Sequence, residues 1–163
     1  MADAQPARIL VVDDETAQMK ALCNTLRADG HETTGYSSPR DALAAFDTQP
    51  FDLLLTDLMM PEMDGIALLR SAQERDPDLV GIMMTGHGTL DSAVEAMKSG
   101  ALDYILKPFK LSVIRPVLAR ALAVRQLRRD NVALARRVAE RTAELEAANQ
   151  ELESFSQIGR AHV

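Results

Sequence analysis

The sequence predicts an α/β domain in which helices cover both faces of a parallel sheet, followed by a long helix. Short apolar runs recur between residues 8 and 110, and segments with helical periodicity separate them. The runs are nearly continuous in apolar character, as in strands that are buried on both faces of a sheet. Beyond residue 110 the chain changes, because residues 111–156 contain no glycine and a single proline, Pro116.

Each predicted element has its own signal. The inner strands are predicted at the apolar runs 9–12, 51–55, 79–84 and 101–106, and the more polar segment 31–37 is predicted to be an edge strand. Helices are predicted over Thr16–Ala28, Pro39–Thr48, Ile66–Arg75 and Thr89–Ser99. Gly30 and Gly100 stand where helices should end. Five strand–helix repeats imply a doubly wound α/β fold with right-handed crossovers.

Composition restricts the class of protein. The chain has 163 residues, 47% of them apolar, which suffices for one domain with a core and an appendage. A formal net charge of −6 argues against a nucleic-acid surface. Cys23 is the only cysteine, so a reducing, cytoplasmic compartment is expected. No apolar run is long enough to span a membrane, and residues 1–8 lack the apolar core of a signal peptide.

Polar side chains stand where the predicted strands end. Asp13 and Asp14 follow the first run, Asp57 follows the run at 51–55, Thr85 follows the next and Lys107 follows the last. The carboxyl ends of parallel strands meet at one edge of a sheet, where the sites of such folds form. We therefore expect three carboxylates, one hydroxyl group and one ammonium group to converge there.

This set of groups is suited to phosphoryl transfer. Clustered carboxylates repel one another by about 4 kcal/mol per pair near a protein surface, so a hard cation such as Mg²⁺ should neutralise them. One carboxylate can then act as the nucleophile and form an aspartyl phosphate. The cation, Lys107 and Thr85 would each stabilise part of the charge on the transferred group. Asp57 is favoured as the nucleophile because it is central in the predicted sheet and precedes an open loop. The other two carboxylates are not excluded on these grounds.

Each residue also has an ordinary structural interpretation. Asp13 and Asp14 could cap the following helix, and Asp57 could simply end a strand. Thr85 could form a turn and Lys107 could lie in solvent. Because these features fall at four strand ends on one edge, their joint occurrence favours a site.

Four segments resemble the receiver domain of two-component response regulators, in order and in spacing. They are Asp13-Asp14, LLLTDLMMPEMDG (53–65), IMMTGHG (82–88) and DYILKPF (103–109). The resemblance covers about residues 7–112, which we expect to form the receiver domain. It implies a flavodoxin-like, doubly wound, five-stranded parallel sheet of strand order 2-1-3-4-5. It also implies a function in phosphorelay signal transduction.

The resemblance implies a role for each carboxylate. Asp57 would be phosphorylated by a cognate histidine kinase or a phosphotransfer protein. Asp13, Asp14 and Asp57 would bind Mg²⁺, with the backbone carbonyl of Met59 as a further ligand. Such a domain catalyses only its own phosphorylation and dephosphorylation, so we do not expect an enzyme in the wider sense.

The resemblance also assigns the other groups at this edge. Thr85 and Lys107 would contact the phosphoryl group. Tyr104 would be the aromatic switch residue that turns inward when Thr85 moves. A cis peptide bond is expected before Pro108, since proline tolerates one.

Residues 113–157 are predicted to form a helical coiled coil. Of the ten seam positions 124, 131, 138, 145, 152, 127, 134, 141, 148 and 155, all but Asn131 and Arg141 are apolar. Asn131 favours a parallel homodimer with a fixed register. A helix packed on its own domain is the alternative. The arginines of this region, 125, 128, 129, 136 and 137, are interpreted as a solvated helix surface.

The output that follows the receiver is left open between two classes. ERTAELEAANQELESFS (140–156) resembles the linker that leads into the dimerisation domain of sensor histidine kinases. We therefore expect the N-terminal fragment of a hybrid histidine kinase, and the alternative is a truncated DNA-binding transcriptional response regulator. A haloacid-dehalogenase-like phosphatase is disfavoured because Met59 stands where that class has its second Asp. A stand-alone dimeric scaffold is a further alternative.

Residues 158–163 are expected to be a non-native tail. They break the heptad pattern, and one back-translation of them matches a common sequencing adapter.

Overall fold

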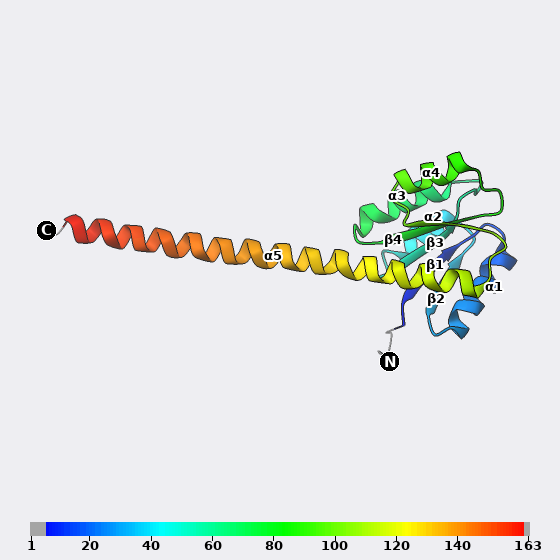
Figure 1. Cartoon of the computed structure of the whole chain (residues 1–163), viewed down its shortest axis with the longest axis horizontal. Helices are drawn as coiled ribbons and strands as arrows, with labels where there is room; N and C mark the ends of the chain where they lie inside the picture. The colour runs from blue at the N-terminus through cyan, green and yellow to red at the C-terminus, as the bar shows by residue number, and fades with distance from the viewer. Residues whose placement is uncertain (1–5, 162–163) are drawn as a thin grey trace. The chain divides into compact units, whose positions relative to one another are not determined.

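A computed structural model describes residues 6–161 and shows a five-stranded parallel sheet of order β2-β1-β3-β4-β5 (Figure 1). The strands are β1 (Arg8–Val12), β2 (Glu32–Tyr36), β3 (Leu53–Asp57), β4 (Val80–Thr85) and β5 (Asp103–Leu106). The helices are α1 (Thr16–Ala28), α2 (Pro39–Ala45), α3 (Gly65–Arg75), α4 (Leu90–Lys98) and α5 (Leu111–Ala161). The predicted fold class, strand order and long C-terminal helix are confirmed.

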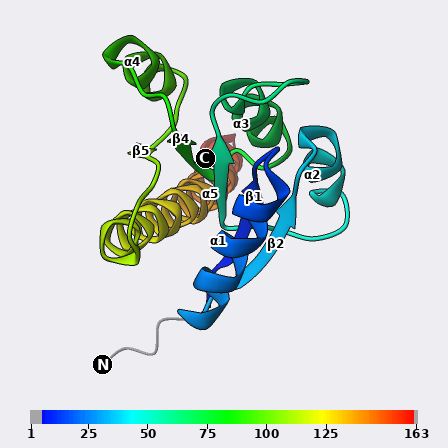
Figure 2. The ribbon, with the colours of Figure 1, turned by 90° about the vertical axis from the view of Figure 1, so that its right-hand side faces the viewer.

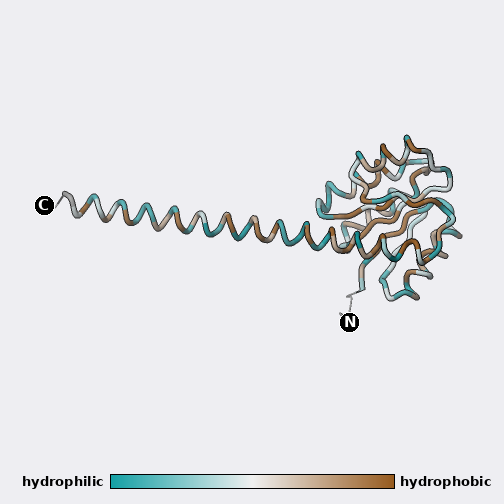
Figure 3. Tube along the Cα trace, in the orientation of Figure 1, coloured by the Kyte–Doolittle hydropathy of each residue, from teal (hydrophilic) through white to brown (hydrophobic). Residues whose placement is uncertain are grey.

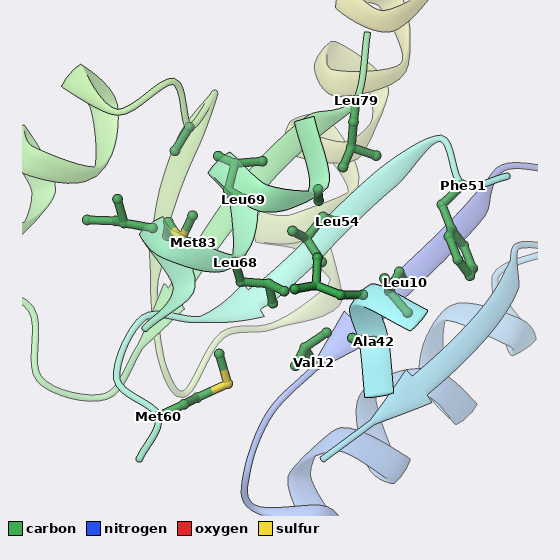
Figure 4. Packing of buried hydrophobic residues seen from close by; sticks show 14 of the residues in the cluster. Leu10, Val12, Ala42, Phe51, Leu54, Met60, Leu68, Leu69, Leu79 and Met83 are labelled. Carbon is green, nitrogen blue, oxygen red and sulfur yellow. The ribbon is translucent and has the colours of Figure 1, made fainter. Parts of the chain in front are cut away.

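Alternate residues of each inner strand supply two separate cores. In β1, Leu10 and Val12 join the cluster beneath α2 and α3, part of which is shown in Figure 4. Ile9 and Val11 join the cluster beneath α1 and the first turns of α5, on the other face of the sheet (Figure 2). Successive side chains of a strand point to opposite faces, so an apolar run buries every residue. This explains why the three inner strands β1, β3 and β4 lack the alternation of a half-exposed strand. The run at 101–106 was also expected to be buried on both faces, but β5 is the other edge strand and only Ile105 of its four residues is buried.

Helix α2 ends earlier than the sequence predicts. It stops at Ala45, and the residues up to Thr48 form turns in which Phe46 and Asp47 donate to the carbonyls three residues before them. Such tightening satisfies carbonyl groups at a helix end. The Phe46 ring then meets the Phe51 ring edge to face, with ring centroids 5.1 Å apart. This aromatic contact closes the core below β3.

The chain forms two compact units, divided between Gln126 and Leu127 within α5. The first part of α5 packs on the sheet through Ile114, Leu118 and Ala121. In the second unit the described residues from Leu127 to Gly159 are exposed, except Arg128, which is half-buried, and the helix continues to Ala161. The predicted coiled coil and the predicted non-native tail stay predictions, and His162 and Val163 of that tail lie outside the described residues. Among the residues that the structure describes, no helix is long and apolar enough to cross a membrane.

Gly65 permits a close approach between α3 and the end of β3. A Cβ atom at this position would lie 2.5 Å from the backbone oxygen of Asp57 and 2.9 Å from the sulfur of Met83. The Gly65 N–H donates to the carbonyl of Leu58 at 2.9 Å, so the helix cannot move away without losing this hydrogen bond. The first turn of α3 is therefore held against the residue that ends β3.

Gly65→Ala should lower the free energy of unfolding by about 1–3 kcal/mol, because the added methyl group forces backbone apart at a packed contact. Denaturant unfolding followed by circular dichroism measures the change. Gly86→Ala is the matched control, since a Cβ atom there meets nothing within 4 Å. Equal midpoints for the two variants would contradict the proposed packing role of Gly65.

Candidate functional site

The carboxyl ends of the strands bring three carboxylates together at one edge of the sheet. Oxygen atoms of Asp13, Asp14 and Asp57 all lie within 4.8 Å of one another. Asp13 follows β1 directly and Asp57 is the last residue of β3, so two neighbouring strands deliver them. Asp13 and Asp57 are buried, whereas Asp14 is exposed. The cluster thus has two fixed members and one member that faces solvent.

Lys107 extends from the end of β5 into this cluster. Its Nζ atom lies 2.5 Å from an oxygen of Asp13 and 3.8 Å from an oxygen of Asp57. The Lys107 N–H donates to the carbonyl of Thr85 at 2.7 Å, which fixes the backbone from which the side chain starts. The Lys107–Pro108 peptide bond is cis, as predicted. One ammonium group therefore lies within 4.0 Å of two of the three carboxylates.

Gln18 is a site residue that sequence reasoning missed. Its Oε1 atom accepts a hydrogen bond from Lys107 Nζ at 3.0 Å, and its Nε2 atom donates to Glu15 at 2.6 Å. It lies in the first turns of α1, just after the acidic pair, where a side chain can reach back over the strand ends. Its position one turn after Asp14 was the available signal. Gln18 helps to hold the ammonium group in place without adding charge.

The local electrostatics make the ionised form of Asp57 costly. Burial raises the pKa of Asp57 above its ordinary value, the Lys107 ammonium opposes this rise, and the charges of Asp13 and Asp14 add to it. A hydrogen bond from the Leu58 N–H lowers the pKa by a smaller amount. A cation bound between the carboxylates would offset both the burial and the repulsion.

The donor set fits Mg²⁺. Carboxylate oxygens from Asp13, Asp14 and Asp57 are the hard ligands that this ion prefers, and a site of few carboxylates leaves positions for water and phosphate oxygens. Met59, whose backbone carbonyl was the other expected ligand, lines the same cleft while its side chain is 67% exposed. The cleft has a volume of about 750 Å³ and is open to solvent. A phosphate-bearing ligand can therefore reach Asp57.

Thr85 ends β4 beside this cluster and is buried. Its Oγ1 atom accepts a hydrogen bond from the His87 N–H at 3.2 Å, and it lines the cleft together with Asp57 and Lys107. The hydroxyl group thus lies on the wall of the cleft that a phosphoryl group on Asp57 would occupy. Its predicted contact with that group stays a prediction.

Tyr104, the predicted switch residue, makes its polar contact with α4. The Tyr104 and Ser92 hydroxyl oxygens lie 3.0 Å apart, and Ser92 also caps the start of α4 reciprocally with Thr89. The ring is partly buried against the core on that face, and a Cβ atom at Gly88 would lie 2.8 Å from its hydroxyl oxygen. Tyr104 therefore links β5 to the first turn of α4. The inward turn of this side chain stays a prediction.

Arg125 was misinterpreted from the sequence. It was assigned to a solvated basic surface, but its side chain is only 4% exposed and it pairs with Asp52 and Asp76. The heptad pattern concealed this role, because Arg125 lies next to a seam position and reads as an outward-facing residue. Its aspartate partners are distant in sequence and give no local signal.

The chain matches the family model of the response regulator receiver domain over residues 9–119. It belongs to this family. It is 40% identical over 114 residues to the response regulator protein FleR of Pseudomonas aeruginosa, covering 70% of this chain and 24% of that protein. It is 41% identical over 115 residues to the transcriptional regulatory protein ZraR of Escherichia coli, covering 71% of this chain and 26% of that protein. The receiver chain thus spans about a quarter of the length of these curated relatives.

Solved structures agree with the receiver assignment. A response regulator receiver domain protein from Clostridium thermocellum superposes with a TM-score of 0.69 at 34% identity, covering 74% of this chain and 98% of that one. NtrX from Brucella abortus superposes with a TM-score of 0.73 at 37% identity, covering 78% of this chain and 29% of that one. The fold and the family are therefore supported by sequence and by structure.

Asp57→Asn should raise the melting temperature at neutral pH. Since the folded-state pKa of Asp57 is raised above the ordinary value of 3.8, its ionisation destabilises the fold, and stability is lost as the pH rises through that window. The amide carries no such cost, so the advantage of the variant should disappear at a pH below 3.8. Scanning calorimetry of both proteins across the acid range measures the difference.

The same pair of proteins tests the cation site. Millimolar Mg²⁺ should raise the melting temperature of the wild type more than that of Asp57→Asn, because a ligand that binds only the folded state stabilises it. An equal Mg²⁺ response in both proteins would exclude Asp57 as a ligand.

Proposed function

We propose that this receiver accepts a phosphoryl group on Asp57 from a histidine kinase or a phosphotransfer protein, in a reaction that requires Mg²⁺. The observation that carries the proposal is the cluster at the strand ends, where three carboxylates and the Lys107 ammonium group share one open cleft. Membership of the receiver family supports it.

The chemistry follows from these groups. An oxygen of the Asp57 carboxylate attacks phosphorus, the bond between phosphorus and the donor's imidazole nitrogen breaks, and that nitrogen keeps the electron pair. Mg²⁺ bound by the carboxylates would offset the negative charge that otherwise repels the incoming phosphoryl group. Lys107 and Thr85 stabilise charge on the phosphoryl oxygens. The product is an aspartyl phosphate, and water attack on its phosphorus returns the free carboxylate. The domain thus acts on its own Asp57 and on no separate substrate.

The phosphoacceptor is testable with a small phosphodonor. Incubation with acetyl phosphate and Mg²⁺ should add one phosphoryl group to the wild-type chain, seen by intact-protein mass spectrometry. Asp57→Asn should show no addition, because the amide is not a nucleophile. The control is Asp47→Asn, which replaces an exposed carboxylate that does not line the cleft, and it should be phosphorylated normally. Labelling of Asp57→Asn at the wild-type level rejects the assignment.

Two classes of output domain are proposed for this receiver: that of a transcriptional regulator and that of a hybrid histidine kinase. The names of the relatives favour a transcriptional regulator, and the likeness to the C4-dicarboxylate transport transcriptional regulatory protein DctD of Rhizobium meliloti extends over 136 residues, at 37% identity, 83% of this chain and 29% of that protein. The resemblance of residues 140–156 to a kinase linker supports the hybrid histidine kinase instead. Sequencing the gene beyond codon 156 separates them, since one predicts a phosphoacceptor-histidine domain and the other a DNA-binding output.

We also propose that the second unit pairs with a second copy as a parallel coiled coil. Its apolar seam residues Leu127, Leu134, Val138, Leu145 and Leu152 are each 55–68% exposed. Apolar residues recur along this part of the helix in Figure 3. A single helix that leaves such a seam in water forgoes about 2 kcal/mol for each leucine, which an identical partner in register would bury. In parallel pairing Asn131 faces its own copy.

Leu145→Lys should weaken self-association at least about tenfold, because each chain loses one buried leucine worth about 2 kcal/mol. Sedimentation equilibrium of the full chain measures the dissociation constant. Ala143→Lys adds the same charge two residues away, outside the seam, and should leave the constant unchanged. A monomeric wild-type chain at every concentration would refute the dimer.

A further inference from the structure

Three arginines of the first unit, spaced five residues apart along α5, each pair with aspartates of other elements. The pairs are Arg115 with Asp29, Arg120 with Asp103, and Arg125 with Asp52 and Asp76. The side chains of Arg115 and Arg120 are 58% and 57% exposed, so water screens their pairs and they contribute little stability. Arg125 is 4% exposed and pairs with two carboxylates at once. This pairing differs in kind from the other two.

The Arg125 guanidinium group bridges two loops at the amino ends of the strands. Its Nε atom donates to Asp52 Oδ1 at 3.2 Å and its Nη2 atom donates to Asp76 Oδ2 at 2.9 Å. The second oxygen of Asp52 accepts from the Arg8 N–H at 2.9 Å, and the second oxygen of Asp76 accepts from the Asp78 N–H at 3.1 Å. Both carboxylates are thus fixed to backbone as well as to Arg125. Arg125 is held in one geometry.

Asp52 and Asp76 lie at the ends of β3 and α3 that are remote from Asp57. Asp52 directly precedes β3, the strand that Asp57 ends. Asp76 caps the end of α3, whose first residue, Gly65, lies against the backbone oxygen of Asp57. Arg125 therefore contacts the far end of the phosphoacceptor strand and the far end of the helix that follows it.

We propose that Arg125 is a positioning residue that ties α5 to β3 and α3, so that a change at Asp57 shifts the last turn of α5 before Leu127. The proposal rests on Asp57 being the phosphoacceptor. Strands and helices transmit small displacements because packed interiors are stiff. α5 is the element that continues into the second unit, so its last turn in the first unit is the point where such a shift leaves the receiver.

One donor of Arg125 is left unpaired in this arrangement. Its Nη1 atom is buried and has no hydrogen-bond partner among the residues that the structure describes. An unpaired buried donor is costly, so a small relative movement of α3 or β3 that supplies an acceptor would be favourable. The proposal therefore assigns the second arrangement of this ion cluster to a state in which Nη1 gains an acceptor.

The first experiment tests whether Arg125 holds α5 through Asp52 and Asp76, in the full chain without a phosphoryl mimic. Hydrogen–deuterium exchange of the peptide covering residues 119–126 should be at least about tenfold faster in Arg125→Met than in the wild type, because two half-buried carboxylates lose their cation. Arg120→Met, which loses an exposed pair on the same helix, should exchange as the wild type does. Equal exchange in the two variants overturns the proposal.

The transmission is tested with fluoroberyllate and Mg²⁺, which mimic a phosphoryl group on Asp57. In the wild type, exchange should change at least about twofold at residues 103–106 and at 119–126. The triple variant Asp52→Asn, Asp76→Asn, Arg125→Met removes the cluster without leaving an unpaired charge, so its melting temperature should stay near the wild-type value. It should keep the response at 103–106 and lose that at 119–126, which a purely structural role of Arg125 would not produce.

The outcomes separate the two proposals. A triple variant that still responds at 119–126 overturns the transmission role of Arg125. A wild-type chain that responds to fluoroberyllate at no peptide refutes the phosphoacceptor function and the transmission with it. In that case the hydrogen–deuterium exchange of Arg125→Met without fluoroberyllate still tests whether Arg125 holds α5 through Asp52 and Asp76.

Discussion

The mutual repulsion of three carboxylates at one edge of a parallel sheet is the constraint on which this receiver depends. Their oxygens lie within 4.8 Å, and burial of Asp57 adds to the cost. Among the described residues that line the cleft, Lys107 supplies one positive charge against the four carboxylates of Asp13, Asp14, Glu15 and Asp57. The arrangement is stable only if cations or hydrogen-bond donors make up the difference. The same imbalance is the physical reason why the proposed function includes a hard cation in this cleft.

At the opposite edge of the sheet a buried cation pairs with carboxylates in a different setting. There Arg125 binds two carboxylates whose remaining oxygens accept from backbone, and the guanidinium group is closed off from water. The two carboxylates are only about a quarter exposed, and Arg125 and the backbone hold them, so the cluster fixes elements to one another. The Asp57 edge is an open cleft with excess negative charge. Aspartates at the two edges of the sheet therefore meet different demands, because a cation can reach one group of them and a buried arginine holds the other.

The fold and the residues of the cleft were predictable because both follow from periodic or adjacent signals. Apolar runs marked the strands, and topology then placed Asp13, Asp57 and Lys107 at one edge without knowledge of any distance. Gln18 and Arg125 were not predictable in this way, since each acts through partners far away in sequence. The sequence predicts a solvated Arg125, because an arginine next to a heptad seam position normally points into solvent. The contact between Tyr104 and Ser92 likewise depends on how closely α4 approaches β5.

Lys107 connects the charge state of Asp57 to α5 most directly. Its ammonium group lies 2.5 Å from Asp13 and 3.8 Å from Asp57, so it is bound mainly by Asp13. A phosphoryl group on Asp57, as proposed above, would add negative charge near this ammonium group and would compete with Asp13 for it. Lys107 is four residues before the start of α5 at Leu111, and its backbone N–H donates to Thr85. A new position of the ammonium group would therefore act on the start of α5, while Arg125 holds the same helix fourteen residues after Leu111.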